Sequence, residues 1–72
     1  MMTKIEFETG GSVWKLLVKP GDRVSQGDTL LILEVMKMEV AYPAPVAGEV
    51  TSVYVAEGDA VEEDQLALEL TS

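Results

Sequence analysis

Glu34-Val35-Met36-Lys37-Met38-Glu39 lies almost at the midpoint of this 72-residue chain. The apolar run Leu30–Val35 leads into this stretch, and a second strand-like run, Val40–Tyr42, follows it. The chain therefore reverses direction at Met36-Lys37. Two-residue hairpin turns favour Asn-Gly, Asp-Gly or a leading glycine, because their central residues take positive φ. We therefore predict positive φ at Met36 and Lys37, a strained conformation of the kind that is common at functional sites.

The rest of the sequence alternates short strands with turns. Alternating or β-branched apolar residues predict strands over residues 3–7, 13–18, 29–35, 38–42, 49–55 and 66–70, with short pieces at 23–24 and 61. Gly21-Asp22 and Gly58-Asp59 predict tight turns whose aspartates bond nearby backbone amides. No helix of ordinary length fits, although Glu62–Gln65 is long enough for one helical turn. The sequence thus predicts an all-β fold.

An internal repeat divides the chain into two similar halves, about residues 11–34 and 48–70. At a constant offset of 37, Gly11, Val13, Val18, Gly21, Asp22, Val24, Leu31 and Leu33 match Gly48, Val50, Val55, Gly58, Asp59, Val61, Leu68 and Leu70. One half is too short to close a hydrophobic core. We therefore expect the two halves to pack face to face as sheets, in a sandwich or flattened barrel that makes residues 1–72 one domain. Lys37 lies on the link between the halves.

The composition excludes several classes of function. Thirteen acidic and five basic residues give a net charge of −8, which argues against nucleic-acid binding because phosphates require a basic surface. Without Cys or His, the chain has no disulfide, thiol nucleophile, histidine base or ordinary zinc site. No apolar run approaches the roughly 18 residues that span a bilayer. We expect no membrane association and a cytoplasmic or matrix-like location.

Lys37 is the candidate functional residue, although a lone lysine in a turn is usually just a solvated charge. Met36 and Met38 alter that balance, because two large apolar side chains exposed at a turn suit a surface that another protein recognises. One of them could instead turn inward and fill a gap at the sheet edge. Glu34 and Glu39 bracket the turn. Paired carboxylates can perform acid–base chemistry, but in a chain too small for a cleft we favour local charge and partner recognition.

Two further features have structural interpretations. Trp14 and Tyr54 occur near equivalent positions of the repeat and are expected to be core or partly buried packing residues. The acidic run Glu57–Asp64 lacks the ligand spacing of a calcium-binding EF-hand loop. We interpret it as a solvated turn and predict no metal site.

Glu34-Val35-Met36-Lys37-Met38 resembles the biotin-attachment motif of biotinyl domains, the carrier modules of biotin-dependent carboxylases. The resemblance runs from about Phe7 to Leu70 and includes the framework segments 11–13, 18–24, 27–30, 44–50 and 57–61. The chain departs from the family at three places: Val35 stands where alanine is usual, Glu8-Thr9-Gly10 replaces a Met-Pro-Gly, and no protruding thumb fits between Val24 and Thr29.

The resemblance implies a flattened β-barrel, or barrel-sandwich hybrid, of two four-stranded antiparallel sheets related by pseudo-twofold symmetry. It implies biotin in amide linkage on Lys37, at an exposed hairpin tip. Met36 and Met38 would be the flanks that biotin protein ligase recognises, with Glu34 and Val35 completing the motif. Related lipoyl domains usually carry aspartate before and alanine after the lysine, so the two methionines favour biotin over lipoate.

A member of this family catalyses nothing itself. In the family's mechanism the lysine loses a proton and attacks biotinyl-adenylate in the ligase, and the biotin then acts as a swinging arm that carries carboxylate from a biotin carboxylase to a carboxyltransferase. Acetyl-CoA carboxylase is one such system, and the sequence leaves the carboxyl acceptor open. Two alternatives also stay open: a lipoyl carrier of a 2-oxoacid dehydrogenase or the glycine cleavage system, and an unmodified barrel-sandwich interaction module.

Overall fold

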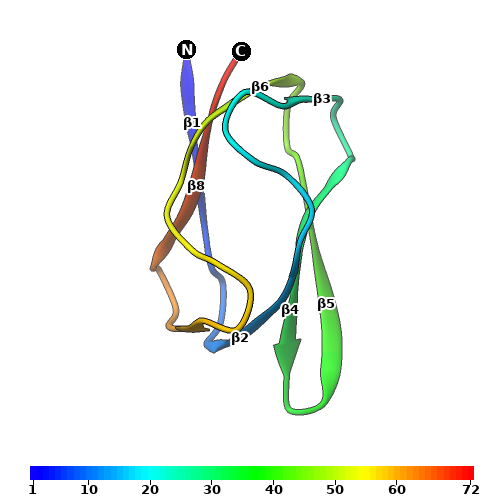
Figure 1. Ribbon diagram of the computed structural model, residues 1–72, viewed down its shortest axis with the longest axis vertical. Coiled ribbons are helices and arrows are strands. Elements are labelled where there is room, and N and C mark those ends of the chain that lie inside the picture. Colours follow the sequence, from blue (N-terminus) through cyan, green and yellow to red (C-terminus); the bar gives the residue numbers. More distant parts are fainter.

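The computed structural model describes all residues, 1–72, as eight strands joined by turns (Figure 1). The strands are β1 (Met2–Glu6), β2 (Gly11–Leu16), β3 (Arg23–Val24), β4 (Thr29–Val35), β5 (Met38–Pro43), β6 (Gly48–Val53), β7 (Ala60–Val61) and β8 (Leu66–Thr71). They form two four-stranded sheets, ordered β1-β8-β6-β3 and β5-β4-β2-β7, in which every pair is antiparallel. The predicted all-β, two-sheet architecture is confirmed. The structure contains no helix that could span a bilayer.

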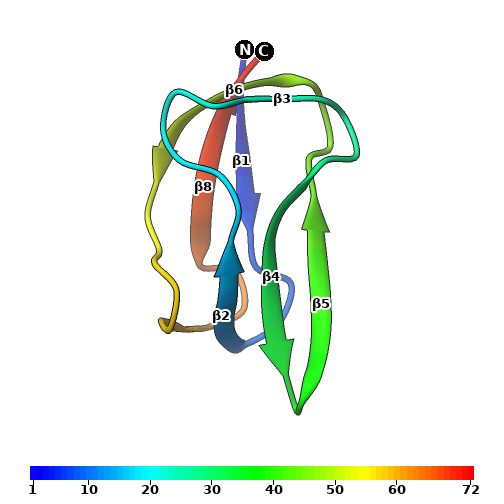
Figure 2. The same ribbon diagram turned by 45° about the vertical axis from the view of Figure 1, so that its right-hand side comes forward.

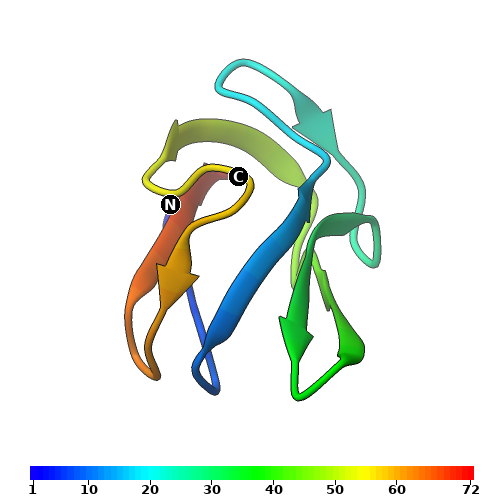
Figure 3. The same ribbon diagram turned by 60° about the horizontal axis from the view of Figure 1, so that its bottom comes forward.

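The repeat relates β1–β4 to β5–β8, but one detail of the expected packing is wrong. The two halves do not each form one sheet, because each sheet takes two strands from either half. Figure 3 shows β4 and β5 (green) on one side of the molecule and β6 and β8 (yellow-green and red) on the other. The reason lies in the Gly-Asp turns, whose backbone bonds cross between halves. Gly21 N donates to Val50 O at 2.8 Å, and its equivalent Gly58 N donates to Val13 O at 2.7 Å.

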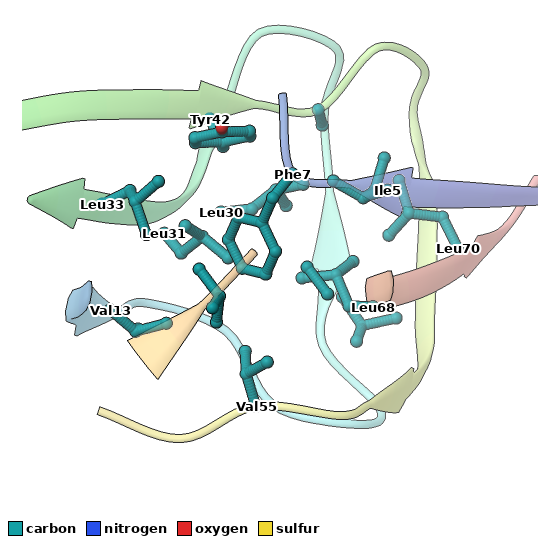
Figure 4. Packing of buried hydrophobic residues seen from close by; sticks show 14 of the residues in the cluster. Ile5, Phe7, Val13, Leu30, Leu31, Leu33, Tyr42, Val55, Leu68 and Leu70 are labelled. Carbon is teal, nitrogen blue, oxygen red and sulfur yellow. The ribbon is translucent and has the colours of Figure 1, made fainter. Parts of the chain in front are cut away.

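The core is a single cluster of fifteen buried apolar residues, with no buried polar or charged residue. Three of the repeat matches supply its centre, since Val13, Leu31 and Leu33 and their equivalents Val50, Leu68 and Leu70 are each at most 1% exposed. Phe7 lies between the sheets, with Leu30 and Leu31 on one side of its ring and Leu68 on the other (Figure 4). Its ring meets Tyr42 edge-on, at 5.6 Å between centroids. Burial of this cluster is the main source of stability available to the chain.

Trp14 and Tyr54 are exposed, so the prediction that they are core or partly buried packing residues is wrong. Their side chains are 45% and 53% exposed. A bulge in β2 between Val13 and Lys15 leaves Trp14 out of the ladder with β4. Trp14 also follows the buried Val13, and successive strand side chains point to opposite faces, so its ring faces solvent, where Lys15 Nζ lies 5.4 Å from its centroid. Tyr54 follows the end of β6, and its hydroxyl donates a hydrogen bond to Glu69 at the surface. The Glu62–Gln65 segment is also a β-turn rather than a helical turn.

The molecule is elongated, with principal extents of 32 × 18 × 17 Å. Both termini lie at one end, and the β4–β5 turn lies at the other (Figures 1 and 2). Ser72 N donates to Met1 O at 3.0 Å, which ties the two ends of the chain together. By the repeat, the β4–β5 hairpin is equivalent to the β8–β1 pair. The hairpin turn is thus a linker that has no counterpart in the other half.

Candidate functional site: the β4–β5 hairpin tip

The tip of the β4–β5 hairpin is a two-residue turn of Met36 and Lys37, closed by the Val35–Met38 pair. The φ angles are 51° at Met36 and 68° at Lys37, which confirms the prediction of positive φ at both positions. Positive φ at both central residues is the requirement of a type I′ turn, which matches the twist of the flanking strands. For residues other than glycine this conformation costs about 1–2 kcal/mol each. The strained backbone therefore coincides with the candidate functional residue.

Both methionines point into solvent. Met36 is 90% exposed and Met38 is 69% exposed. The alternative in which one of them turns inward and fills a gap is therefore wrong. Cross-strand pairing explains the exposure of Met38: it pairs with Val35, and both lie on the face of the hairpin that carries Leu33. Val35 and Met38 lie nearer the turn than Leu33, so this face of the hairpin reaches solvent at the tip.

The opposite face of the hairpin is acidic. Glu34 and Glu39 are direct cross-strand partners, and both are exposed. No surface hollow is lined by any residue from 34 to 39, because the three hollows of the molecule lie along other segments. Without an enclosed site the two carboxylates have no environment for acid–base catalysis. This agrees with their interpretation as local charge.

Lys37 makes no hydrogen bond and no ion pair within the chain, and the only ion pair of the molecule joins Lys19 to Asp22 at 3.2 Å. The backbone amide and ammonium of Lys19 lower the pKa of Asp22, and the hydrogen bond to Glu69 raises the pKa of Tyr54. The Lys37 amine is thus an exposed and unpaired nucleophile at the end of the molecule, and nothing around it would obstruct an acyl group in amide linkage.

Gly11 belongs to the site, although the sequence indicates only that it is part of the repeat. It begins β2 beside the end of β4, where a Cβ atom at residue 11 would lie 2.5 Å from Glu34 O. The feature of the sequence that singles out Gly11 is its match with Gly48 in the repeat. What it could not indicate was that the neighbour of Gly11 would be the strand leading to Lys37.

Comparison with known proteins supplies the family context. A family model described as "Biotin-requiring enzyme" matches residues 2–70. The chain is 40% identical over 68 residues to the biotin/lipoyl attachment protein of Bacillus subtilis (strain 168), covering 94% of this chain and 93% of that protein. It is 39% identical over 66 residues to a biotinylated protein, the TB7.3 homolog of Mycobacterium leprae (strain TN), covering 92% and 93%.

Larger proteins contain a similar segment. The chain is 45% identical over 60 residues to the dihydrolipoyllysine-residue acetyltransferase component of the pyruvate dehydrogenase complex of Pseudomonas aeruginosa, covering 83% of this chain and 11% of that protein. The solved structure of the Kluyveromyces lactis urea carboxylase contains the same fold, with a TM-score of 0.90 and 31% identity over 99% of this chain and 6% of that one. The chain thus spans nearly all of the two small relatives and a minor part of the two large ones.

Proposed function

The chain belongs to the family of biotin- and lipoyl-attachment domains, and from that premise we propose that it is a biotin carboxyl carrier whose biotin is attached to Lys37. The observation that carries the proposal is the hairpin tip. It presents a free amine between two exposed methionines, on backbone with positive φ at Met36 and Lys37. Strain and exposed apolar surface at one turn bring no benefit to folding, and both are understandable if a second protein recognises the turn.

Biotin is the favoured cofactor for two reasons. The matching family model is described by a biotin requirement, and a relative that is matched along nearly its whole length is named as a biotinylated protein. Met36 and Met38 also stand where related lipoyl domains usually carry aspartate and alanine. The second candidate is a lipoyl carrier, which the similarity to the lipoyl-bearing acetyltransferase component supports. Both cofactors would use the same amine, so the choice depends on which ligase accepts the tip.

The residues of the chain have simple roles in this function. Lys37 Nζ loses a proton and forms an amide bond with the activated carboxyl carbon of biotin, from which the activating group departs. Met36 and Met38, with Glu34 and Val35, are the surface that biotin protein ligase contacts. When attached, biotin supplies a ring that accepts and releases carboxylate. The folded barrel contributes a rigid base, and the Lys37 side chain contributes a flexible tether that raises the local concentration of the ring at two active sites.

The chain would act with a biotin carboxylase and a carboxyltransferase. Because no hollow adjoins the tip, selection of the carboxyl acceptor, acetyl-CoA or another, falls to the carboxyltransferase and not to this chain. The carrier itself has no catalytic residue. We propose that it acts in the cytoplasm, where it would meet these partners.

The test is intact mass spectrometry after incubation with biotin protein ligase, biotin and ATP, and in parallel with lipoate ligase, lipoate and ATP. One biotinyl group should be added, and none to Lys37→Arg. Lys15→Arg is the matched control, since Lys15 is an exposed strand lysine away from the tip, and it should be labelled as wild type is. Biotin on Lys37→Arg would disprove the attachment site. Lipoate in place of biotin would establish the second candidate, and no modification by either ligase would indicate an interaction module.

A further inference from the structure

Gly11 is packed against the backbone that leads to Lys37. A Cβ atom at this position would lie 2.5 Å from Glu34 O, 3.0 Å from Val35 Cγ2 and 3.2 Å from Leu33 Cγ. Cβ atoms essentially never approach other heavy atoms within 3.0 Å, so β4 would have to retreat by roughly half an ångström. Gly11 does not have positive φ, so conformational freedom is not the reason for glycine here. The reason is the close approach of β2 to the last residues of β4.

Gly48 repeats this contact at the other end of the molecule. A Cβ atom there would lie 2.6 Å from Thr71 O and 3.1 Å from Thr71 C. Gly48 also lacks positive φ, and it begins β6 as Gly11 begins β2. The two contacts differ in what they support. Gly48 packs against the end of β8 beside the chain termini, whereas Gly11 packs against the end of β4, whose next residues are Met36 and Lys37.

We propose that Gly11 is a positioning residue for Lys37. Because it has no side chain, Gly11 lets the end of β4 approach β2 closely, and this approach sets the direction in which the tip projects. This inference rests on the proposed function. Lys37 lies three residues beyond Glu34, in the turn that directly follows β4, so a displacement of the end of β4 is carried to the tip. A ligase that must bring Lys37 Nζ to an activated carboxyl group depends on that direction. Misplacement of a reacting group by about 1 Å can lower a rate 100-fold.

The experiment compares Gly11→Ala with Gly48→Ala, which insert the same methyl group into equivalent contacts. Three quantities are measured for each variant and for wild type: the melting temperature, kcat/KM for biotin transfer by the ligase, and the rate of Lys37 acylation by a small N-hydroxysuccinimide ester of biotin. We expect similar losses of melting temperature in the two variants. Only Gly11→Ala should show a lower ligase kcat/KM, by roughly 10- to 100-fold. Acylation by the small ester should be unchanged in both, because it requires only an exposed amine.

Three outcomes would overturn the inference. Equal ligase rates in the two variants would show that the tip is insensitive to Gly11. A slower reaction of Gly11→Ala with the small ester would show loss of amine exposure and not of orientation. An unfolded Gly11→Ala beside a folded Gly48→Ala, by near-ultraviolet circular dichroism, would make Gly11 a general stability residue. A wild-type chain that the ligase does not label at all would instead refute the proposed function, so the two failures are distinguishable.

Discussion

Glu34 and Glu39 lie directly opposite each other across the β4–β5 ladder, one residue pair below the pair that closes the Met36-Lys37 turn. Like charges at directly opposed strand positions destabilise a hairpin. The Glu34–Glu39 pair therefore lowers the stability of the hairpin that carries Lys37. Neither carboxylate makes a hydrogen bond or ion pair, so no compensating contact offsets the repulsion within the chain.

Replacing one of these charges should stabilise the protein. Glu39→Lys places an ammonium opposite Glu34, and opposite-charge pairs at such positions contribute about 0.2–1 kcal/mol. We expect the free energy of unfolding, measured by urea denaturation, to rise by an amount in that range. Glu39→Lys in a Glu34→Gln background is the control, and most of the gain should disappear there. A gain that persists without Glu34 would show that the effect arises from a general reduction of the net charge and not from the pair.

The methionines should matter for ligation and not for stability. Met36→Ala and Met38→Ala each remove an exposed side chain, so the free energy of unfolding should change by less than about 0.5 kcal/mol. If both side chains are contacted by the ligase, kcat/KM for biotin transfer should fall about tenfold for each, which corresponds to about 1.4 kcal/mol of lost binding. Met2→Ala is the matched control, since Met2 is 52% exposed on β1. An equal loss in Met2→Ala would exclude specific recognition of the tip.

The repeat made much of the fold predictable. Several of its matched residues, such as Leu31 and Leu68, stand at positions that the two-sheet packing buries completely. It could not determine which strands share a sheet. That choice depends on backbone bonds such as Gly58 N to Val13 O, which join segments distant in sequence and involve no particular side chain. The exposure of Trp14 was missed although strand alternation accounts for it, because Val13 is buried and the next side chain points to the opposite face.

The candidate site was predictable where it depends on local chain geometry. A reversal at Met36-Lys37 without glycine requires unusual φ values, and the structure has them. Gly11 escaped prediction because its importance comes from a tertiary contact with Glu34. Glycine at the start of a strand is ordinarily explained by turn geometry, and only the position of the neighbouring strand shows that close approach is the reason.

Asp22 should give stability a specific dependence on pH. Its carboxylate accepts hydrogen bonds from Lys19 N at 3.0 Å and Lys19 Nζ at 3.2 Å, and these lower the pKa of Asp22 below its ordinary value of 3.8. Because the folded pKa is below the unfolded one, this stabilisation is fully present above the unfolded value and is lost as pH falls through the folded pKa. Asp22→Ala should therefore have a lower melting temperature than wild type at pH 7, and the difference should shrink below about pH 4.

Glu63→Ala is the control for this pH dependence. Glu63 is exposed and makes no hydrogen bond through its side chain, so its removal should leave the melting temperature nearly unchanged at every pH. A difference between wild type and Asp22→Ala that stays constant from pH 7 to pH 2 would show that the contribution of the Asp22 side chain does not depend on the ionised carboxylate.

Charge is distributed unequally between the two ends of the molecule. The equivalent turn regions 19–28 and 56–65 lie at opposite ends, the second at the same end as Lys37 (Figures 1 and 2). Residues 19–28 contain two acidic and two basic residues, whereas residues 56–65 contain five acidic residues and no basic one. If this field steers the proposed ligase, biotin transfer should slow as ionic strength rises from about 0.02 to 0.5 M, because salt screens exposed charges.

The repeat supplies a variant that removes three of these charges with little risk to the fold. Glu62→Ser, Glu63→Gln and Asp64→Gly together install the residues that occupy positions 25–27. Asp64 has a φ of 69° and its equivalent Gly27 has a φ of 91°, so glycine relieves strain at this position. At low salt, kcat/KM should fall roughly 2- to 10-fold with a shallower salt dependence, and the difference from wild type should vanish near 0.5 M.

Asp28→Gln is the matched control for steering. Asp28 Oδ2 accepts from Ser25 N at 2.9 Å just as Gln65 Oε1 accepts from Glu62 N at 3.0 Å, so the exchange preserves the turn and removes one charge at the end away from Lys37. Its salt dependence should match that of wild type. A reduction about one third as large as that of the triple variant, in proportion to the charge removed, would mean that the total charge, and not its placement beside Lys37, governs the encounter.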